Sequence, residues 1–96
     1  MRDLPVCDQI KAIAERIIWF EPPGKALSNV VRFLAYAFSR ASWEDMQALR
    51  QYLNDEELRE ALDRAPPGII DARSWACWNA KFGRYPAPAM PQRRFG

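Results

Sequence analysis

The sequence predicts an all-α protein: a compact bundle of four to five short helices with an extended Pro/Arg-rich C-terminal tail. Apolar residues recur at helical spacing in five segments, prolines and glycines separate those segments, and none of them shows the pattern of a strand. Hydrophobic residues make up 49% of the 96 residues, which is too many for a disordered chain. We therefore expect a single helical domain over residues 1–83 and a basic, proline-rich tail over residues 84–96.

Two helices are predicted in the first half of the chain, over residues 6–18 and 25–40. The second is apolar nearly all round, as is typical of a helix at the centre of a bundle. Glu21-Pro22-Pro23-Gly24 separates the two helices, because the residue before a proline is driven out of the helical region. The apolar positions are Val6, Ile10, Ile13, Ala14, Ile17 and Ile18 in the first helix, and Leu27, Val30, Val31, Leu34, Ala35 and Phe38 in the second.

Three shorter helices follow, and each is predicted to open at a capping residue: Ser42, Asn54 or Asp71. Ser42 and Asn54 each precede an acidic residue by three positions, which is the spacing of a capping box. Pro66-Pro67-Gly68 ends the fourth helix, and Gly83 is placed to end the fifth. The inward positions are Met46, Leu49, Tyr52 and Leu53, then Leu58, Ala61, Leu62 and Ala65, then Trp75, Trp78 and Phe82.

The composition argues against catalysis and against a metal or cofactor site. The chain has no histidine, the commonest general base and metal ligand. Its two cysteines, Cys7 and Cys77, lack CxxC spacing and are interpreted as reduced core thiols. The acidic run from Asp55 to Glu57 falls in the first turn of a helix, where it stabilises the helix dipole. The chain is therefore predicted not to be an enzyme.

The same features predict a cytoplasmic protein. A secreted domain of this size would usually have four or more cysteines. The first ten residues, MRDLPVCDQI, contain no apolar run that would suit a signal sequence. No stretch approaches about 18 uninterrupted apolar residues, so no membrane segment is expected.

Charge is distributed unevenly along the chain. Residues 40–64 carry four basic and seven acidic side chains, whereas residues 71–96 carry five basic and one acidic. The helix DEELREALDRA would be the second member of a helix-turn-helix pair, and its acidic character argues against sequence-specific DNA binding. The basic C-terminal face leaves open an alternative function, that of a small nucleic-acid-binding regulator.

The segment from Ile70 to Phe95 is the predicted partner-binding region. It combines tryptophans, arginines and prolines, a composition typical of protein–protein hot spots. Trp75 and Trp78 fit a role in the core equally well. The candidate binding residues are Arg73, Trp75, Trp78, Lys81, Arg84, Tyr85, Pro86, Arg93, Arg94 and Phe95.

Several stretches of residues 17–83 resemble a family of short prokaryotic helical proteins. The matching pieces are Trp19 to Pro22, Arg32 to Phe38, Ser42-Trp43-Glu44-Asp45, Glu56 to Leu62, and Ile70 to Trp75 with Trp78. Members of this family are often encoded beside AbiEii-type nucleotidyltransferase toxins. The resemblance implies that the protein is an antitoxin that binds and neutralises such a toxin.

The resemblance also implies a way to inhibit the toxin, because such nucleotidyltransferases hold metal ions with acidic residues around the nucleotide site. A basic tail bearing Arg84, Arg93 and Arg94 is then expected to lie against the acidic residues around that nucleotide site. A third interpretation is self-association, in which the tryptophan face pairs with itself about a two-fold axis.

Overall fold

The computed structural model describes residues 4–91 and contains, within that range, six helices and no strand. The predicted all-α fold class is confirmed. The radius of gyration is 13.0 Å, close to the roughly 12–13 Å expected for a compact domain of this length. No helix in the described range has the length and apolar character needed to cross a bilayer. The helices are α1 (Asp8–Ile17), α2 (Pro23–Leu27), α3 (Val30–Arg40), α4 (Trp43–Leu49), α5 (Asp55–Asp63) and α6 (Ala72–Lys81).

The described range contains six helices, one more than the five helical segments predicted, because the predicted helix over residues 25–40 is divided in two. Ser28 ends α2, and its hydroxyl donates a hydrogen bond to the carbonyl of Lys25 (2.6 Å). Asn29 adopts an extended conformation and caps α3 by accepting from the backbone N–H of Arg32. Serine and asparagine side chains compete with the helical ladder in this way, whereas apolar spacing alone does not detect the break.

The three predicted capping residues are confirmed. Ser42, Asn54 and Asp71 each accept a hydrogen bond from the backbone N–H three residues later. At Asn54 the capping box is complete, since the Glu57 carboxylate accepts the Asn54 N–H in return. At Ser42 it is not reciprocated, because the Asp45 carboxylate pairs with Arg16 of α1 instead.

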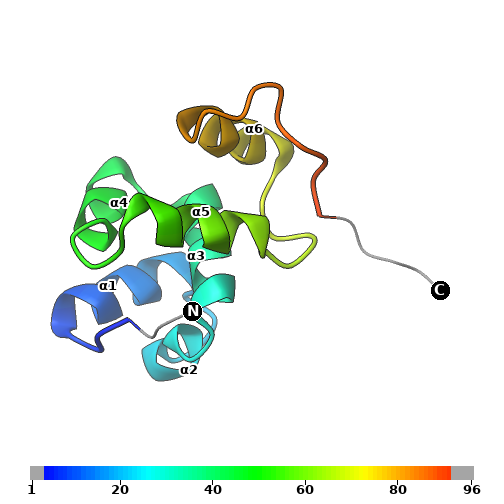
Figure 1. Cartoon of the computed structure of the whole chain (residues 1–96). Coiled ribbons are helices and arrows are strands. Elements are labelled where there is room, and N and C mark those ends of the chain that lie inside the picture. The colour runs from blue at the N-terminus through cyan, green and yellow to red at the C-terminus, as the bar shows by residue number, and fades with distance from the viewer. Residues whose placement is uncertain (1–3, 92–96) are drawn as a thin grey trace.

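Helix α3 is the centre of the fold, as its apolar surface predicted. It contacts α1, α2, α5 and α6, and in Figure 1 it lies between α6 above and the α1–α2 pair below. Phe33, Leu34 and Ala35 are wholly buried, together with Ile10 of α1 and Leu58 of α5. Burying aliphatic and aromatic side chains of this size supplies about 1.5–3 kcal/mol each, so α3 is the element on which the core is assembled.

The cysteines depart from the sequence prediction. Cys77 lies on the exposed side of α6, and Cys7 is half-buried at the start of α1. Position 77 is two residues from both Trp75 and Asn79, which are buried, so it lies on the opposite side of the helix and faces solvent. The interpretation of both thiols as core residues is therefore wrong for Cys77.

Candidate partner-binding surface

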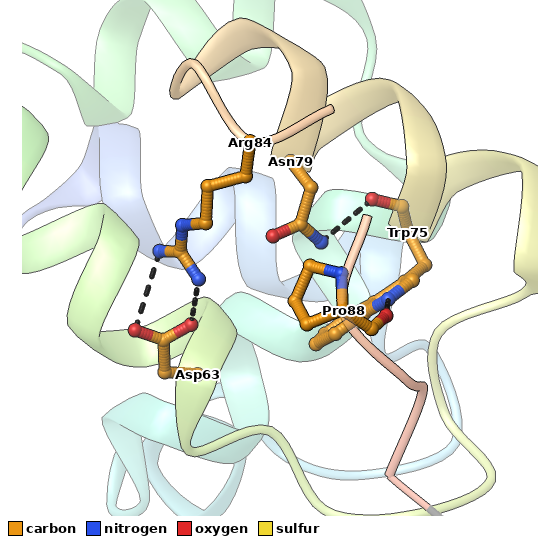
Figure 2. Close-up of polar contacts among 5 residues, drawn as sticks. All are labelled: Asp63, Trp75, Asn79, Arg84 and Pro88. Carbon is orange, nitrogen blue, oxygen red and sulfur yellow. Dashed lines mark hydrogen bonds and ion pairs between the residues drawn. The ribbon is translucent and has the colours of Figure 1, made fainter. Parts of the chain in front are cut away.

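Residues 84–91 form no helix or strand, and they lie back against α6 (Figure 2). The indole N–H of Trp75 donates a hydrogen bond to the carbonyl of Pro88 (2.7 Å), and the Trp75 side chain is only 5% exposed. Ala87 and Met90 pack against the core. Trp75, a predicted partner contact, is therefore part of the core in this structure and has little surface to offer.

Arg84 fixes the start of this segment. Its guanidinium makes a two-pronged ion pair with the Asp63 carboxylate at the end of α5 (Figure 2), and its backbone N–H donates to the carbonyl of Asn79 (2.8 Å). Asn79 is wholly buried and donates from its side-chain amide to the carbonyl of Trp75 (2.9 Å). Arg84 is thus committed to a partner within the chain.

The other predicted site residues are spread over the C-terminal surface. Arg73 and Pro86 are exposed, and Tyr85 is 89% exposed. Tyr85 directly precedes Pro86 in the segment after α6, whereas Arg73 lies in the first turn of α6. Arg93, Arg94 and Phe95 lie outside the described residues.

Trp78 and Lys81 are brought together at a pocket between α4 and α6, called here the α4–α6 pocket. It has a volume of about 240 Å³. The Lys81 ammonium lies over the Trp78 ring, 4.4 Å from the ring centre. Trp43 stands at the rim and is 67% exposed. The lining residues are Ala41, Ser42, Trp43, Met46, Trp78 and Lys81.

Local structure accounts for the positions of Trp43 and Trp78 at the pocket. Trp43 is the first residue of α4, and Ser42 caps that helix. The Trp78 indole N–H donates to the carbonyl of Phe38 (3.0 Å), and the two rings meet edge to face with 5.0 Å between their centres. Because the donor of Trp78 is satisfied by α3, its ring is held in place to support Lys81.

A second group of exposed aromatic side chains, called here the Trp19 cluster, lies where α1 ends and packs on α3. Trp19 is 76% exposed and meets Phe20 edge to face at 5.7 Å, and Phe20 meets Tyr36 in the same way at 5.8 Å. The guanidinium groups of Arg32 and Arg40 lie over the Tyr36 ring at 5.2 and 4.9 Å. The result is a continuous series of aromatic rings and cations on the surface.

The two arginines of the Trp19 cluster differ in their partners. Arg32 forms an ion pair with Glu21 (2.5 Å), and the hydrogen bond to Glu21 raises the pKa of Arg32. Arg40 instead donates to the carbonyl of Ile17 (3.3 Å) and has no carboxylate partner among residues 4–91. Arg40 therefore keeps donors and a full charge available to another molecule.

Taken together, these surfaces are suited to binding. Trp, Tyr and Arg are the residues most enriched at protein–protein hot spots, and Trp43 and Trp19 leave large apolar areas in contact with water. In the described part of the chain, no three Cys, Asp or Glu side chains gather in a way that could hold a metal ion.

Sequence reasoning missed Trp19, Arg40 and Trp43. A signal existed for Trp19, which follows Ile17 by two positions and so falls off the buried stripe of the preceding helix. Trp43 precedes Met46 by three positions and would be assigned to the buried face. Trp43 is nevertheless exposed, because the packing of the first turn of α4 in the folded protein leaves its side chain uncovered.

Comparison with known proteins adds no assignment, since no family model, curated protein or solved structure matches this chain.

Proposed function

We propose that this protein is a non-catalytic binding protein that docks a protein partner at the α4–α6 pocket. In the more specific form of the proposal, which rests on the family resemblance, the partner is a nucleotidyltransferase toxin and the protein is its antitoxin. The observation that supports binding is that a highly exposed Trp43 and the Trp78–Lys81 stack line the same pocket.

The pocket has the features of a hot spot. Met46 and Ala41 contribute apolar surface to its lining, which can contact an apolar side chain of the partner. Lys81 supplies a cation at the edge, where a carboxylate of the partner would form a charge-assisted hydrogen bond. Docking of a toxin there would use its acidic surface, which is the surface that holds metal ions around the nucleotide. Inhibition would then follow from exclusion of the nucleotide.

Site-specific crosslinking in the native host tests this proposal. A photo-reactive phenylalanine analogue replaces Trp43 in the full-length chain, and crosslinked products are identified by mass spectrometry after irradiation of cells. The expected result is one dominant protein adduct, and a nucleotidyltransferase in that adduct would support the antitoxin role.

The matched control places the same analogue at Gln51, which is exposed just after α4 but does not line the pocket. An adduct from position 43 that is absent from position 51 supports docking at the pocket. Identical adducts from both positions, or none from position 43, would overturn the proposal. A dominant adduct with an unrelated protein would retain the docking site and remove the toxin as its partner.

A further inference from the structure

The side of α6 that carries Trp75 and Asn79, called here the Trp75 face, holds residues 84–91 with one of its polar groups unused. The Trp75 indole donates to the carbonyl of Pro88 (2.7 Å), but the side-chain oxygen of Asn79 is buried and has no hydrogen-bond donor among residues 4–91. From this mismatch we infer that the Trp75 face binds an extended segment of a partner protein, which replaces residues 84–91 and supplies the missing N–H. Binding there does not depend on docking at the α4–α6 pocket.

The indole donor and the unused acceptor lie close together on the helix. Trp75 and Asn79 are four positions apart and so share one side of α6. The Asn79 amide nitrogen donates to the carbonyl of Trp75 (2.9 Å), and in Figure 2 the amide lies between Arg84 and the Trp75–Pro88 pair, with its oxygen turned away from that carbonyl. Asn79 is wholly buried, so bulk water does not reach its oxygen. The Trp75 face thus offers one donor and one acceptor, which are the two groups that a polypeptide backbone pairs with.

The proline at position 88 explains why the acceptor is unused. In an extended chain the N–H and C=O of one residue point to the same side. The residue that presents its C=O to Trp75 therefore directs its own N–H toward the same side of α6. Proline has no N–H, so Pro88 can accept from the indole but cannot donate to Asn79. Any other residue in that place would bring the donor that Pro88 lacks.

Residues 84–91 are held in a way that allows their release. Gly83, with a φ of +80°, separates them from α6, and they form no helix or strand. Arg84 pairs with Asp63 at the surface, where ion pairs contribute little to stability. The remaining contacts are the indole hydrogen bond and the packing of Ala87 and Met90 against the core. A segment with so few buried contacts opens locally at a lower cost than that of unfolding the domain.

The occupant that gains most at the Trp75 face is a segment of a different protein. Residues 84–91 of a second copy would bring the same proline and leave Asn79 without a donor. The tethered segment has an effective concentration that is roughly millimolar, so an incoming segment displaces it only by making an additional contact. A non-prolyl residue opposite Trp75 makes that contact. Because Ala87 and Met90 pack against the core, we expect apolar side chains at the corresponding positions of the partner.

The full-length Pro88→Ala variant tests the pairing with Asn79. The substitution gives residue 88 an N–H, which Asn79 should accept, so that the segment opens less often and trypsin cleavage after Arg84 slows about fivefold. The same substitution in an Asn79→Leu background should not slow cleavage. Pro91→Ala is the matched control, because it removes a proline away from the indole contact, and it should not slow cleavage either. Cleavage of Pro88→Ala at the wild-type rate or faster would overturn the proposed contact.

Selection from a displayed library of random 12-residue peptides, with the full-length protein as bait, tests binding of a partner segment. Peptides bound at the Trp75 face should release residues 84–91 and therefore speed trypsin cleavage after Arg84. They should bind the Pro88→Ala variant about fivefold more weakly than the wild type, since the chain's own segment then competes better. Trp43→Ala is the control and should bind these peptides as the wild type does, because Trp43 lines the α4–α6 pocket.

The outcomes distinguish this face from the α4–α6 pocket. Peptides that speed cleavage and bind without Trp43 would support the Trp75 face even where the pocket proves unused. Peptides that need Trp43 and leave cleavage unchanged would contradict binding at the Trp75 face and retain the pocket. Failure to recover any peptide that speeds cleavage would likewise overturn the inferred partner segment. A wild-type dimer in light scattering that becomes monomeric in Trp75→Phe would assign the face to a second copy instead.

Discussion

Single residues at helix starts determine much of this fold, and Asp71 shows how. Its carboxylate accepts from the backbone N–H of Ser74 (3.1 Å), and its own N–H donates to the Ser39 hydroxyl of α3 (3.3 Å). The hydrogen bonds from Ser74, and to a lesser degree that from Ser39, lower the pKa of Asp71 below its usual 3.8. Asp71 thus both begins α6 and ties it to α3.

The depressed pKa of Asp71 leads to a prediction of pH dependence. A carboxyl group with a lower pKa in the folded state stabilises the protein above its unfolded pKa, and this contribution is lost as the pH falls through the folded value. Asp71→Asn keeps a capping acceptor without the charge. Its melting temperature should therefore lie below that of the wild type by a constant amount above about pH 5, and approach it toward about pH 2. Asp71→Ala, which also removes the cap, should stay less stable at every pH. Parallel wild-type and Asp71→Asn profiles down to that acidity would contradict this account.

Features of this kind were predictable from the sequence. A cap depends on a side chain and a backbone N–H three residues away, so Ser42, Asn54 and Asp71 could be assigned without knowledge of the tertiary structure. The pairing of Asp45 could not be predicted in this way, because its carboxylate forms an ion pair with Arg16, which is 29 positions away in the sequence. The break at Ser28 and Asn29 was missed because the apolar pattern continues across it.

Among the elements, α6 carries two tryptophans that bind different parts of the chain. The Trp75 indole binds the Pro88 carbonyl, and the Trp78 indole binds the Phe38 carbonyl of α3. Sequence patterning placed both on one face of a helix but could not show that the chain itself returns to cover Trp75. Residues 84–91 lack a periodic pattern, so their position follows from contacts made only in the folded protein.

Trp75→Phe should loosen residues 84–91 without unfolding the domain. It removes the indole donor and keeps a ring in the core, at a cost of about 1 kcal/mol. Trypsin cleavage after Arg84 should then become about fivefold faster, because local opening becomes more frequent. Trp78→Phe is the control, because it removes a hydrogen bond to α3 and not one to residues 84–91. It should lower the overall stability, with a smaller effect on cleavage after Arg84 than Trp75→Phe has. Unchanged cleavage of the Trp75→Phe variant would show that the segment is held by other contacts.

For the molecule as a whole, stability depends on a small core assembled on α3. Leu34 is wholly buried at the centre of that helix. Leu34→Ala should lower the free energy of unfolding by about 2–5 kcal/mol, a large part of the roughly 5–15 kcal/mol available to a typical domain. Gln47→Ala, on the exposed side of α4, should change it by no more than about 0.5 kcal/mol. Urea denaturation followed by circular dichroism measures both, and a loss below about 1 kcal/mol at Leu34 would mean that α3 is not the centre of the core.

At this scale the sequence indicated the fold class and the central helix, because both follow from the distribution of apolar residues. It indicated the candidate site only in part. Trp78 and Lys81 were predicted and do meet at a pocket, but Trp43, which lines the same pocket, comes from the first turn of α4. Surface exposure of a tryptophan is a property of the assembled molecule, so residue type alone could not separate Trp43 and Trp19 from Trp75.

The central claim is tested most directly by measuring how tightly the partner that is crosslinked at position 43 binds to variants of the pocket. Isothermal titration calorimetry would compare the wild type with the Trp43→Ala/Lys81→Ala double variant, and with Gln51→Ala as control. Loss of two hot-spot side chains should weaken binding by about 100-fold or more, with the control unchanged. Equal affinities of wild type and double variant would contradict the assignment of the α4–α6 pocket as the docking site.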